Sequence, residues 1–346
     1  MKVLVIGTGG REHALALALS RDPQITEVHA VPGIPCLGAV ASLHPVPAAD
    51  GTGGAKLANR LGVDLVVIGP EAPLVAGVAD AVRQAGIACF GPSAEAAQLE
   101  GSKAFAKQVM AEANVPTAEP RVCTSPEQVE AALDFFGAPY VVKDDALAAG
   151  KGVVVTSDRA EALAHANSCD RVVIEAFLDG PEVSLFAITD GVTAVPLQPA
   201  QDFKRALDND EGPNTGGMGA YSPLAWAPET LVDDVMRTVI QPTVDRMAER
   251  GTPFQGLLYA GLALTKKGIE VVEFNARFGD PETQVLMALL DSSIGDLLWG
   301  AATGTLDSFD APVWKPGAAV TVVVSSEGYP SKPRTGDVIE GLREAN

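Results

Sequence analysis

An acid, an amide and a guanidinium alternate along one apolar stretch of this 346-residue chain. Residues 271 to 282 read Val-Val-Glu-Phe-Asn-Ala-Arg-Phe-Gly-Asp-Pro-Glu. Because side chains on a β-strand alternate between its two faces, this spacing predicts one polar face and one apolar face. The polar face carries Glu273, Asn275 and Arg277, and the apolar face carries Val272, Phe274 and Ala276.

The predicted polar face suits an anionic ligand and its counter-ion. A carboxylate and an amide oxygen two residues apart favour a magnesium ion, which takes a few hard oxygen ligands together with phosphate oxygens. The planar fork of Arg277 can hold a phosphate or a carboxylate. Asp280 and Pro281 predict the N-cap and the first position of a helix that runs to Leu290. The alternative interpretation is a half-buried edge strand whose polar face is only solvated.

Composition narrows the class of protein. The length allows two or three domains with full cores, and contents of 47% hydrophobic and 20% charged residues are ordinary for a folded globular protein. The formal net charge of −19 argues against a nucleic-acid partner, because phosphate backbones require clustered lysine and arginine. The four cysteines are scattered, and no apolar run reaches membrane-spanning length. We therefore predict a cytoplasmic protein that acts on small molecules, with no nucleic-acid and no membrane partner.

Strands and helices alternate over the first 100 residues. The predicted strands are Lys2 to Ile6, Glu27 to Val31, Asp64 to Ile68 and Ile87 to Phe90. This alternation predicts a parallel, doubly wound sheet. Such sheets bind ligands at the carboxyl ends of their strands.

Two turns lie at strand ends of this predicted sheet. Gly7-Thr8-Gly9-Gly10 opens a predicted helix from Arg11 to Ser20, and its free backbone amides would hold a phosphate. It is not a dinucleotide fingerprint, because Glu12 stands where the third glycine is required. Gly69-Pro70-Glu71 follows the third strand and is a candidate for the same pocket. The alternative is that these turns serve only to reverse the chain.

The middle of the chain predicts a small unit built around a hairpin. A helix from Ala94 to Glu112 carries Lys103, for which a solvated lysine is the default interpretation. The strand that ends at Lys143 pairs with the strand Val153 to Thr156, and the tip between them contains Gly150-Lys151-Gly152. This tip is not a P-loop, because its glycine spacing and the hydroxyl after the lysine are missing. Its backbone amides and Lys151 can nevertheless donate to phosphates, which Lys143 would also reach.

Two further segments have the composition of a nucleotide site and a lid. After a strand from Val172 to Ile174, an apolar segment with Phe177 and Leu178 can hold an adenine ring, and Glu182 can bind ribose hydroxyls. Residues 201 to 219 are predicted to form a long glycine-rich loop, and loops of this length are usually functional. A strand from Leu257 to Leu264 then pairs with the strand that carries Glu273.

Several separate segments also carry recognisable motifs. They are Gly9 to Leu15, Gly69 to Leu74, Leu99 to Lys103, Leu147 to Gly152, Gly212 to Tyr221 and Glu273 to Glu282. Each is weak alone, but in this order the chain resembles the glycinamide ribonucleotide synthetase family of the ATP-grasp superfamily, from Met1 to about Pro333. The resemblance implies an amino-terminal parallel, doubly wound α/β domain (1–100) and an ATP-grasp domain (101–310) with a small lid subdomain at about 119–187. Residues 311–346 would begin a carboxy-terminal domain that is truncated here.

The same resemblance implies a role for each candidate residue. The nucleotide phosphates would meet Lys103, Lys143 and the loop Gly150, Lys151 and Gly152. The adenosine site would consist of Glu175, Phe177, Leu178 and Glu182. Magnesium or manganese ligands would be Glu273 and Asn275, with Arg277 near the transferred phosphoryl group. The phosphoribosylamine site would include Gly9, Gly10, Glu12 and Glu71. Glycine, amine and phosphate would meet at Asp202, Lys204, Asn214, Thr215, Gly216, Gly217, Met218 and Gly219.

The implied reaction activates a carboxylate with ATP. Glycine would attack the terminal phosphate to give glycyl phosphate and ADP, and the amine of 5-phosphoribosylamine would then displace phosphate to form an amide. Carboxylate and triphosphate are both anionic, so the site must neutralise charge. The acyl phosphate must also be shielded from water by a closing loop.

The chain departs from the family pattern at a few positions. Asp144-Asp145-Ala146 follows Lys143 where Lys-x-Asp-Gly is usual, Phe203 replaces a common histidine, and Ile34 replaces a common asparagine. Two alternatives to the synthetase therefore stay open. One is another ATP-grasp carboxylate-amine ligase, and the other is a non-catalytic nucleotide-binding protein.

Overall fold

The computed structural model describes residues 1–147 and 152–341, and its amino-terminal part is a five-stranded sheet. The strands run in the order β3-β2-β1-β4-β5, and every pair is parallel. They are β1 (Lys2–Gly7), β2 (Glu27–Pro32), β3 (Ser42–Leu43), β4 (Leu65–Ile68) and β5 (Ala88–Phe90). The predicted parallel sheet is confirmed, with β3 as a short edge strand that the sequence did not reveal.

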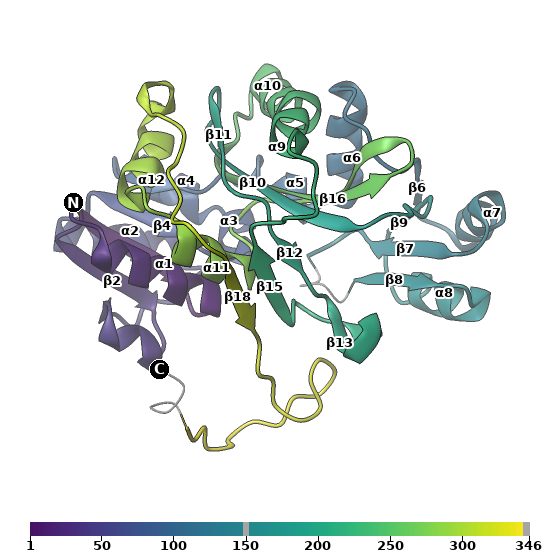
Figure 1. The fold of residues 1–346 in the computed structure, drawn as a ribbon, viewed down its shortest axis with the longest axis horizontal. Coiled ribbons are helices and arrows are strands. Elements are labelled where there is room, and N and C mark those ends of the chain that lie inside the picture. The colour runs from purple at the N-terminus through teal and green to yellow at the C-terminus, as the bar shows by residue number, and fades with distance from the viewer. Residues whose placement is uncertain (148–151, 342–346) are drawn as a thin grey trace.

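Helices cover both faces of this sheet, as Figure 1 shows for the purple and blue elements. They are α1 (Gly10–Arg21), η1 (Pro35–Ala39), α2 (Gly51–Leu61), α3 (Glu71–Val75) and α4 (Val78–Gln84). Val3 and Val5 of β1 belong to the core cluster that contains α1, whereas Leu4 and Ile6 belong to the cluster that contains α2. Burial on both faces explains why the strand is apolar throughout rather than alternating.

The predicted helix from Ala94 to Glu112 is wrong as a single element. It is divided into α5 (Gln98–Gly101) and α6 (Lys103–Glu112). Ser102 between them has an extended backbone, and its hydroxyl accepts a hydrogen bond from the amide of Phe105 at 3.1 Å. Because serine is a strong N-cap, the chain starts a new helix here. Lys103 therefore occupies the first position of a helix.

A small antiparallel sheet follows, at the right of Figure 1, and contains the predicted hairpin. Its order is β6-β9-β7-β8, formed by β6 (Pro120–Cys123), β7 (Tyr140–Asp144), β8 (Val153–Thr156) and β9 (Val172–Glu175). The helices α7 (Pro126–Phe136) and α8 (Arg159–Ala166) pack on it around a separate apolar cluster. The pairing of β7 with β8 confirms the hairpin.

The central antiparallel sheet carries the strand with Glu273. It is built from β11 (Ala194–Pro196), β10 (Glu182–Asp190), β16 (Gln255–Thr265) and β17 (Gly268–Asn275), in that order. The expected pairing of β16 with β17 is confirmed, but the predicted face of Val272 is wrong. Gly261 pairs with Glu273 and Leu262 with Val271, so Val272 is the extra residue of a β-bulge. Val271 and Phe274 therefore share the core face, while Glu273 and Asn275 keep the same face.

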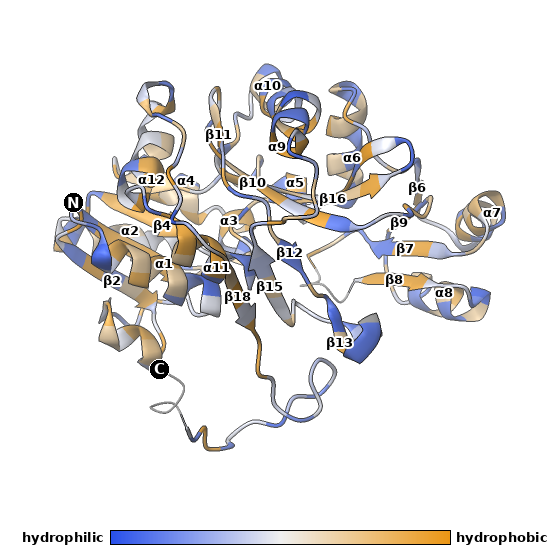
Figure 2. Cartoon of the chain, in the orientation of Figure 1, coloured by the Kyte–Doolittle hydropathy of each residue, from blue (hydrophilic) through white to orange (hydrophobic). Residues whose placement is uncertain are grey.

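The predicted glycine-rich loop of residues 201 to 219 is also largely wrong. Most of it pairs as β12 (Gln201–Asp202), β13 (Arg205–Leu207), β14 (Glu211–Asn214) and the start of β15 (Gly219–Ser222). β13 and β14 form a hairpin, which is hydrophilic in Figure 2, and β15 lies between β12 and β18 (Ala319–Val322). Backbone pairing thus orders most of this segment, which leaves a short turn between β14 and β15.

Helices of the carboxy-terminal half complete the fold. They are η2 (Asp208–Asp210), α9 (Leu231–Val235), η3 (Met236–Ile240), α10 (Gln241–Glu249), α11 (Glu282–Leu289), α12 (Ile294–Thr303) and η4 (Leu306–Ser308). The helix α11 packs on α1, so the carboxy-terminal half contacts the amino-terminal sheet domain (Figure 1). None of the helices in the described residues has the length and apolar character needed to cross a membrane.

Candidate active site

Glu273 of β17 is the carboxylate around which the predicted cations gather. Burial alone would raise the pKa of the Glu273 carboxyl, but nearby positive charges lower it overall. These charges are Lys204, Lys143, Lys103 and Arg277. They come from the segment after β12, β7, the start of α6 and the segment after β17, so the structure brings together residues predicted from four separate parts of the chain.

Glu273 and Asn275 have the donor chemistry for a divalent cation. Neither side chain has a hydrogen-bond or ion-pair partner within residues 1–147 and 152–341. Their oxygens lie on one face of β17 because no bulge separates the two positions. No group of three or more acidic, cysteine or histidine side chains in the described part of the chain is arranged to hold a metal ion. A carboxylate and an amide oxygen that are not otherwise engaged fit magnesium, whose remaining ligands are water and phosphate oxygens.

Glu175 lies between two lysines rather than beside solvent. Its carboxylate forms an ion pair with Lys143 through Oε1, and Oε2 lies 2.5 Å from Nζ of Lys107. The ammonium of Lys143 also donates to the carbonyl of Val272, the bulge residue, at 2.9 Å. The exposed fractions of Glu175 and Lys107 are 3% and 6%. Glu175 was predicted for the adenosine site, and the structure places it next to the predicted phosphate-binding lysine.

Sequence reasoning missed Lys107. Its ammonium donates to Thr117 Oγ1 at 2.7 Å and to the carbonyl of Ala118 at 3.1 Å, in the segment that leads from α6 to β6. Burial lowers the pKa of Lys107, and the Glu175 charge opposes that effect. The spacing of four residues from Lys103 is the signal that could have revealed it, because residues i and i+4 share a helix face.

Asp145 attaches the end of β7 to the start of α6. Its carboxylate accepts from the amide of Ala104 at 3.0 Å and from the hydroxyl of Ser102 at 3.1 Å, and it pairs with Arg171. Lys103 donates to the carbonyl of Ala146 at 3.1 Å. Asp145 belongs to the segment that departs from the family pattern. Its carboxylate caps the N-terminus of α6, where a negative charge is favourable.

The glycine loop at the hairpin tip is described only in part. Gly150 and Lys151 lie outside the described residues. Gly152 is described, and its carbonyl accepts from the amide of Asp144 at 2.7 Å. Phe177 and Leu178 follow β9 in an irregular segment, and Phe177 is exposed.

Lys204 interacts both with Glu182, the predicted ribose contact, and with Asp202 of the predicted substrate site. Its ammonium pairs with Glu182 Oε2 at 3.0 Å. Burial opposes the charge of Lys204, yet Asp202, Glu182 and Glu273 together raise its pKa well above the usual range. Burial raises the pKa of Asp202, while Lys204 counteracts it. An acid and a base whose pKa values are both raised therefore interact at the end of β12.

The turn between β14 and β15 packs against the segment that precedes α11. Thr215 donates to the carbonyl of Lys204 at 2.9 Å and accepts from the amide of Gly217 at 3.0 Å. Gly217 has a φ of +123°, and a Cβ there would lie 2.5 Å from Cδ of Pro281. The remaining residues predicted here are Asn214, which ends β14, Gly216, Met218 and Gly219, which begins β15. Only glycine fits both the backbone and the contact at Gly217, so this turn is fixed beside Pro281.

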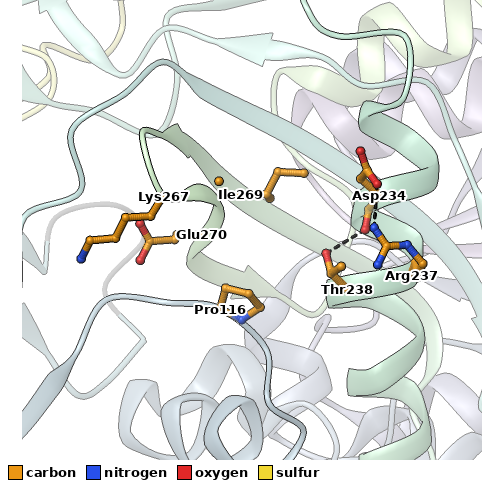
Figure 3. A pocket seen from close by; sticks show the side chains of 8 residues that line it. Pro116, Asp234, Arg237, Thr238, Lys267, Ile269 and Glu270 are labelled. Atoms are coloured by element: carbon orange, nitrogen blue, oxygen red, sulfur yellow. Dashed lines mark hydrogen bonds and ion pairs between the residues drawn. The ribbon is translucent and has the colours of Figure 1, made fainter.

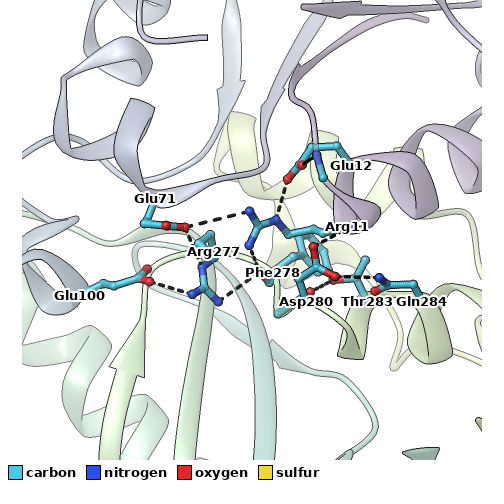
Figure 4. A network of polar contacts seen from close by, with 11 residues as sticks. Arg11, Glu12, Glu71, Glu100, Arg277, Phe278, Asp280, Thr283 and Gln284 are labelled. Atoms are coloured by element: carbon cyan, nitrogen blue, oxygen red, sulfur yellow. Dashed lines mark hydrogen bonds and ion pairs between the residues drawn. The ribbon is translucent and has the colours of Figure 1, made fainter. Parts of the chain in front are cut away.

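The first glycine turn has fewer free amides than the sequence predicted. The amide of Gly9 donates to Glu12 Oε2 at 2.5 Å, and the amide of Arg11 donates to Asp280 Oδ2 at 3.2 Å (Figure 4). Carboxylates of the chain thus occupy two donors of the α1 N-terminus, as is favourable at a helix start. Gly10 lies beside the same Asp280 carboxylate.

The predicted N-cap at Asp280 is accordingly wrong. The helix α11 begins at Glu282, and its N-cap residue is Pro281 without a side-chain bond. The Asp280 carboxylate instead accepts from Arg11 and from Gln284 Nε2, the latter at 2.7 Å. Asp280 was predicted to cap α11, but its carboxylate instead bonds a side chain of α11 and a backbone amide of α1.

Arg277 connects the segment after β17 to residues of the first 100 positions (Figure 4). Its Nη2 lies 2.9 Å from Glu100 Oε1, and its Nε donates to Glu71 Oε2 at 3.3 Å. The Arg277 charge lowers the pKa of Glu71 overall, although burial acts in the opposite direction. At Glu100 burial is the larger effect, and the pKa is raised despite Arg277. Arg11 joins this network by donating to the carbonyl of Phe278 at 3.0 Å. Glu71, predicted for the phosphoribosylamine site, is therefore tied to the residue predicted for the phosphoryl group.

A separate surface cavity does not contain these residues. It has a volume of about 400 Å³ and lies near the turn between β16 and β17 (Figure 3). Its lining is Pro116, Asp234, Arg237, Thr238, Lys267, Gly268, Ile269 and Glu270. None of the predicted site residues lines it, and its Arg237 is paired with Asp234 at 2.8 Å. The arrangement of charges, rather than this cavity, defines the candidate site.

By sequence similarity the chain is an ATP-grasp ligase. Residues 1–100 match the family description "Phosphoribosylglycinamide synthetase, N domain", and residues 101–283 match "Phosphoribosylglycinamide synthetase, ATP-grasp (A) domain". The chain belongs to the phosphoribosylglycinamide synthetase family, whose members are enzymes of ATP-dependent glycine ligation in purine biosynthesis.

Relatives and solved structures agree with this assignment. The phosphoribosylamine–glycine ligase of Streptomyces coelicolor is 67% identical over 344 residues, which are 99% of this chain and 83% of that protein. The crystal structure of the Thermotoga maritima phosphoribosylamine–glycine ligase is 32% identical with a TM-score of 0.84, over 96% of this chain and 83% of that one. A biotin carboxylase from Campylobacter jejuni, at 16% identity and a TM-score of 0.73, covers 96% of this chain and 77% of its own, and shares the fold.

Proposed function

We propose that this chain joins glycine to 5-phosphoribosylamine at the expense of ATP, giving glycinamide ribonucleotide, ADP and phosphate through glycyl phosphate. The gathering of cations around Glu273 carries this proposal, because activation of a carboxylate by a triphosphate requires charge neutralisation where the two anions meet. We further propose the domain division 1–100, 101–310 with a lid at about 119–187, and 311–346, and a cytoplasmic location.

The residues of the site have distinct tasks in this proposal. Lys103 and Lys143 bind the nucleotide phosphates, and each retains N–H donors beyond the hydrogen bonds it makes within the described residues. Arg277 is held by Glu71 and Glu100 just after β17, where it orients the glycine carboxylate against the terminal phosphate.

The divalent ion and the adenosine site complete the proposal. Glu273 and Asn275 would hold magnesium or manganese, which neutralises phosphate charge and aligns the transferred group. Phe177, Leu178 and Glu182 would contact the adenosine, and the loop around Lys151 would close over the phosphates. Asp202, Lys204 and the turn 214–219 would receive the amine.

A coupled assay tests this function. The expected result is ADP release that requires glycine together with 5-phosphoribosylamine generated in situ. Turnover with a different acid or amine would replace the proposal with another carboxylate-amine ligase, and ATP binding without turnover would replace it with a nucleotide-binding protein. The Glu273→Gln variant is expected to lose at least about two orders of magnitude in kcat while it retains its circular dichroism spectrum. A fully active variant would refute the assignment of the metal ligand.

A further inference from the structure

Three buried side chains form a hydrogen-bonded chain that begins at Asp202. Ser184 Oγ donates to Asp202 Oδ1 at 3.5 Å, Ser184 Oγ lies 2.8 Å from the Tyr259 hydroxyl, and Tyr259 donates to Glu282 Oε1 at 2.7 Å. The exposed fractions of Ser184, Tyr259 and Glu282 are 2%, 4% and 2%. The tasks assigned above use Asp202 but none of the other three.

The sheet register and helix α11 fix this chain of groups. β10 and β16 are paired, with Phe186 opposite Tyr259 and Ser184 opposite Gly261, so Ser184 and Tyr259 are diagonal neighbours. The Tyr259 ring packs against Phe186 with centroids 4.7 Å apart. Glu282 is the first residue of α11 and follows the segment against which Gly217 packs. The strand register and the ring packing therefore hold the two hydroxyl oxygens close together.

The four groups from Asp202 to Glu282 lack one hydrogen when both carboxyls are ionised. Three contacts connect the four groups from Asp202 to Glu282, but when both carboxyls are ionised only two hydroxyl hydrogens serve them. One contact then places two oxygens together without a hydrogen between them. A single added proton completes all three contacts, whether it resides on Asp202 or on Glu282. Moving it from one end to the other only shifts each hydroxyl hydrogen to the next oxygen.

The electrostatics agree with one shared proton. Burial is the main cause that raises the pKa of Glu282 to about 7, and the Asp202 charge adds to it. Burial also raises the pKa of Asp202. The other charged groups that act on the two carboxyls are Arg277 at Glu282 and Lys204, Glu182 and Glu273 at Asp202. Two carboxyls joined by two hydroxyls in a buried setting cannot both stay ionised at low cost.

We propose that Ser184, Tyr259 and Glu282 form a proton relay that takes up, through Asp202, the proton released when the amine is acylated. This inference rests on the proposed function. The amine nitrogen bonds to the carbonyl carbon of glycyl phosphate, and phosphate leaves with the electron pair of the carbon–oxygen bond. The N–H proton passes to Asp202, and shifts along Ser184 and Tyr259 then place one proton on Glu282. No oxidant or reductant is involved, and the proton leaves for solvent after product release.

The Tyr259→Phe variant tests the relay, because it removes the bridging hydroxyl and keeps the ring packing against Phe186. We expect kcat to fall by about 10², with KM for ATP unchanged. We also expect kcat of the natural chain to rise with pH near neutrality, and this rise to disappear in the variant. Tyr221→Phe is the matched control, since its hydroxyl also bonds two partners, Gln201 and Trp226, but lies outside the relay. That control should retain kcat and its pH profile.

Further variants separate the relay from a structural role. Ser184→Ala removes the other hydroxyl and should give the same loss, which keeps the test decisive if Tyr259→Phe fails to fold. Glu282→Gln can still form hydrogen bonds but cannot take up a proton, so it should also flatten the pH profile. A folded Tyr259→Phe or Ser184→Ala enzyme with unchanged kcat and pH profile would overturn the relay alone. A natural chain without glycine- and amine-dependent ADP release would instead overturn the proposed function on which the relay rests.

Discussion

Replacement of Lys107 by methionine should destabilise the protein, because it leaves a buried carboxylate short of one cation. Lys107 lies on α6 with 6% of its surface exposed, and its ammonium is 2.5 Å from the Glu175 carboxylate. The same ammonium donates to Thr117 and Ala118, which lead into the small sheet. Methionine keeps much of the length and packing of the lysine stem but removes all of these bonds.

The magnitude follows from what remains around Glu175. Removal of one partner of a buried ion pair typically costs 3–5 kcal/mol. Glu175 keeps its ion pair with Lys143, so we expect the low end, about 3 kcal/mol. At roughly 2 °C per kcal/mol for a large chain, the melting temperature should fall by about 6 °C.

Urea unfolding and thermal melts of four variants provide the assay: Lys107→Met, Glu175→Gln, the double variant of the two, and a control. Lys56→Met is the matched control, since Lys56 is an exposed helical lysine without a hydrogen bond or ion pair among the described residues, and it should change the unfolding free energy by less than about 0.5 kcal/mol. The double variant Lys107→Met/Glu175→Gln removes both charges. It should be less destabilised than the sum of the two single variants, by about 1–3 kcal/mol.

Two results would refute this reasoning. If Lys107→Met were no less stable than Lys56→Met, the loss of a cation beside the buried Glu175 carboxylate would not affect the stability of the protein. If the double variant showed simple additivity, Lys107 and Glu175 would not interact energetically in the way their geometry indicates.

Two further predictions concern the lid attachment and the relay acid. Asp145→Ala should leave the amide of Ala104 without its acceptor, so this amide should exchange with deuterium faster, while exchange in the β1 amides stays unchanged. The pKa of Glu282 is about 7 in the folded state, above its ordinary value of 4.5. Between pH 4.5 and pH 7 the folded state therefore binds more protons at Glu282 than the unfolded state does. The contribution of this group to stability accordingly falls as the pH rises through that range. Relative to the natural chain, Glu282→Gln should therefore gain up to about 3 kcal/mol of unfolding free energy between pH 4.5 and pH 7.5, and a pH-independent difference in urea unfolding would contradict this.

The sequence predicted those parts of the fold that local patterns determine. The buried β1 and the helix α1 that follows its glycine turn were recognisable because a parallel strand covered on both faces is uniformly apolar. The hairpin of β7 and β8 was recognisable because two β-branched runs flank a small-residue turn. The alternation of Glu273 and Asn275 was also recognisable from the strand period alone.

Features that depend on distant partners were missed. The break at Ser102 follows from a capping hydroxyl and from Asp145, which lies 43 residues further along. The bulge at Val272 is invisible without the register of β16, and a one-residue slip reverses the face of the preceding side chains. The ion pair of Arg277 with Glu71 spans 206 residues, so no local pattern could reveal that the two predicted sites share one network.

The charge balance of the site shows how an acidic protein can receive a triphosphate. The cations near the site are Lys103, Lys107, Lys143, Lys204, Arg277 and Arg11. The acids that contact or act on them are Glu175, Glu182, Glu71, Glu100, Glu12, Glu273, Asp202 and Glu282. The acids are at least as numerous, so a net positive field does not explain the proposed attraction for ATP. The acids instead hold each cation in place, and an ammonium with one or two partners keeps further N–H donors for phosphate oxygens. Because these donors are positioned before the ligand arrives, little ordering entropy remains to be lost on binding, and a divalent ion at Glu273 and Asn275 would supply the positive charge that the side chains alone do not.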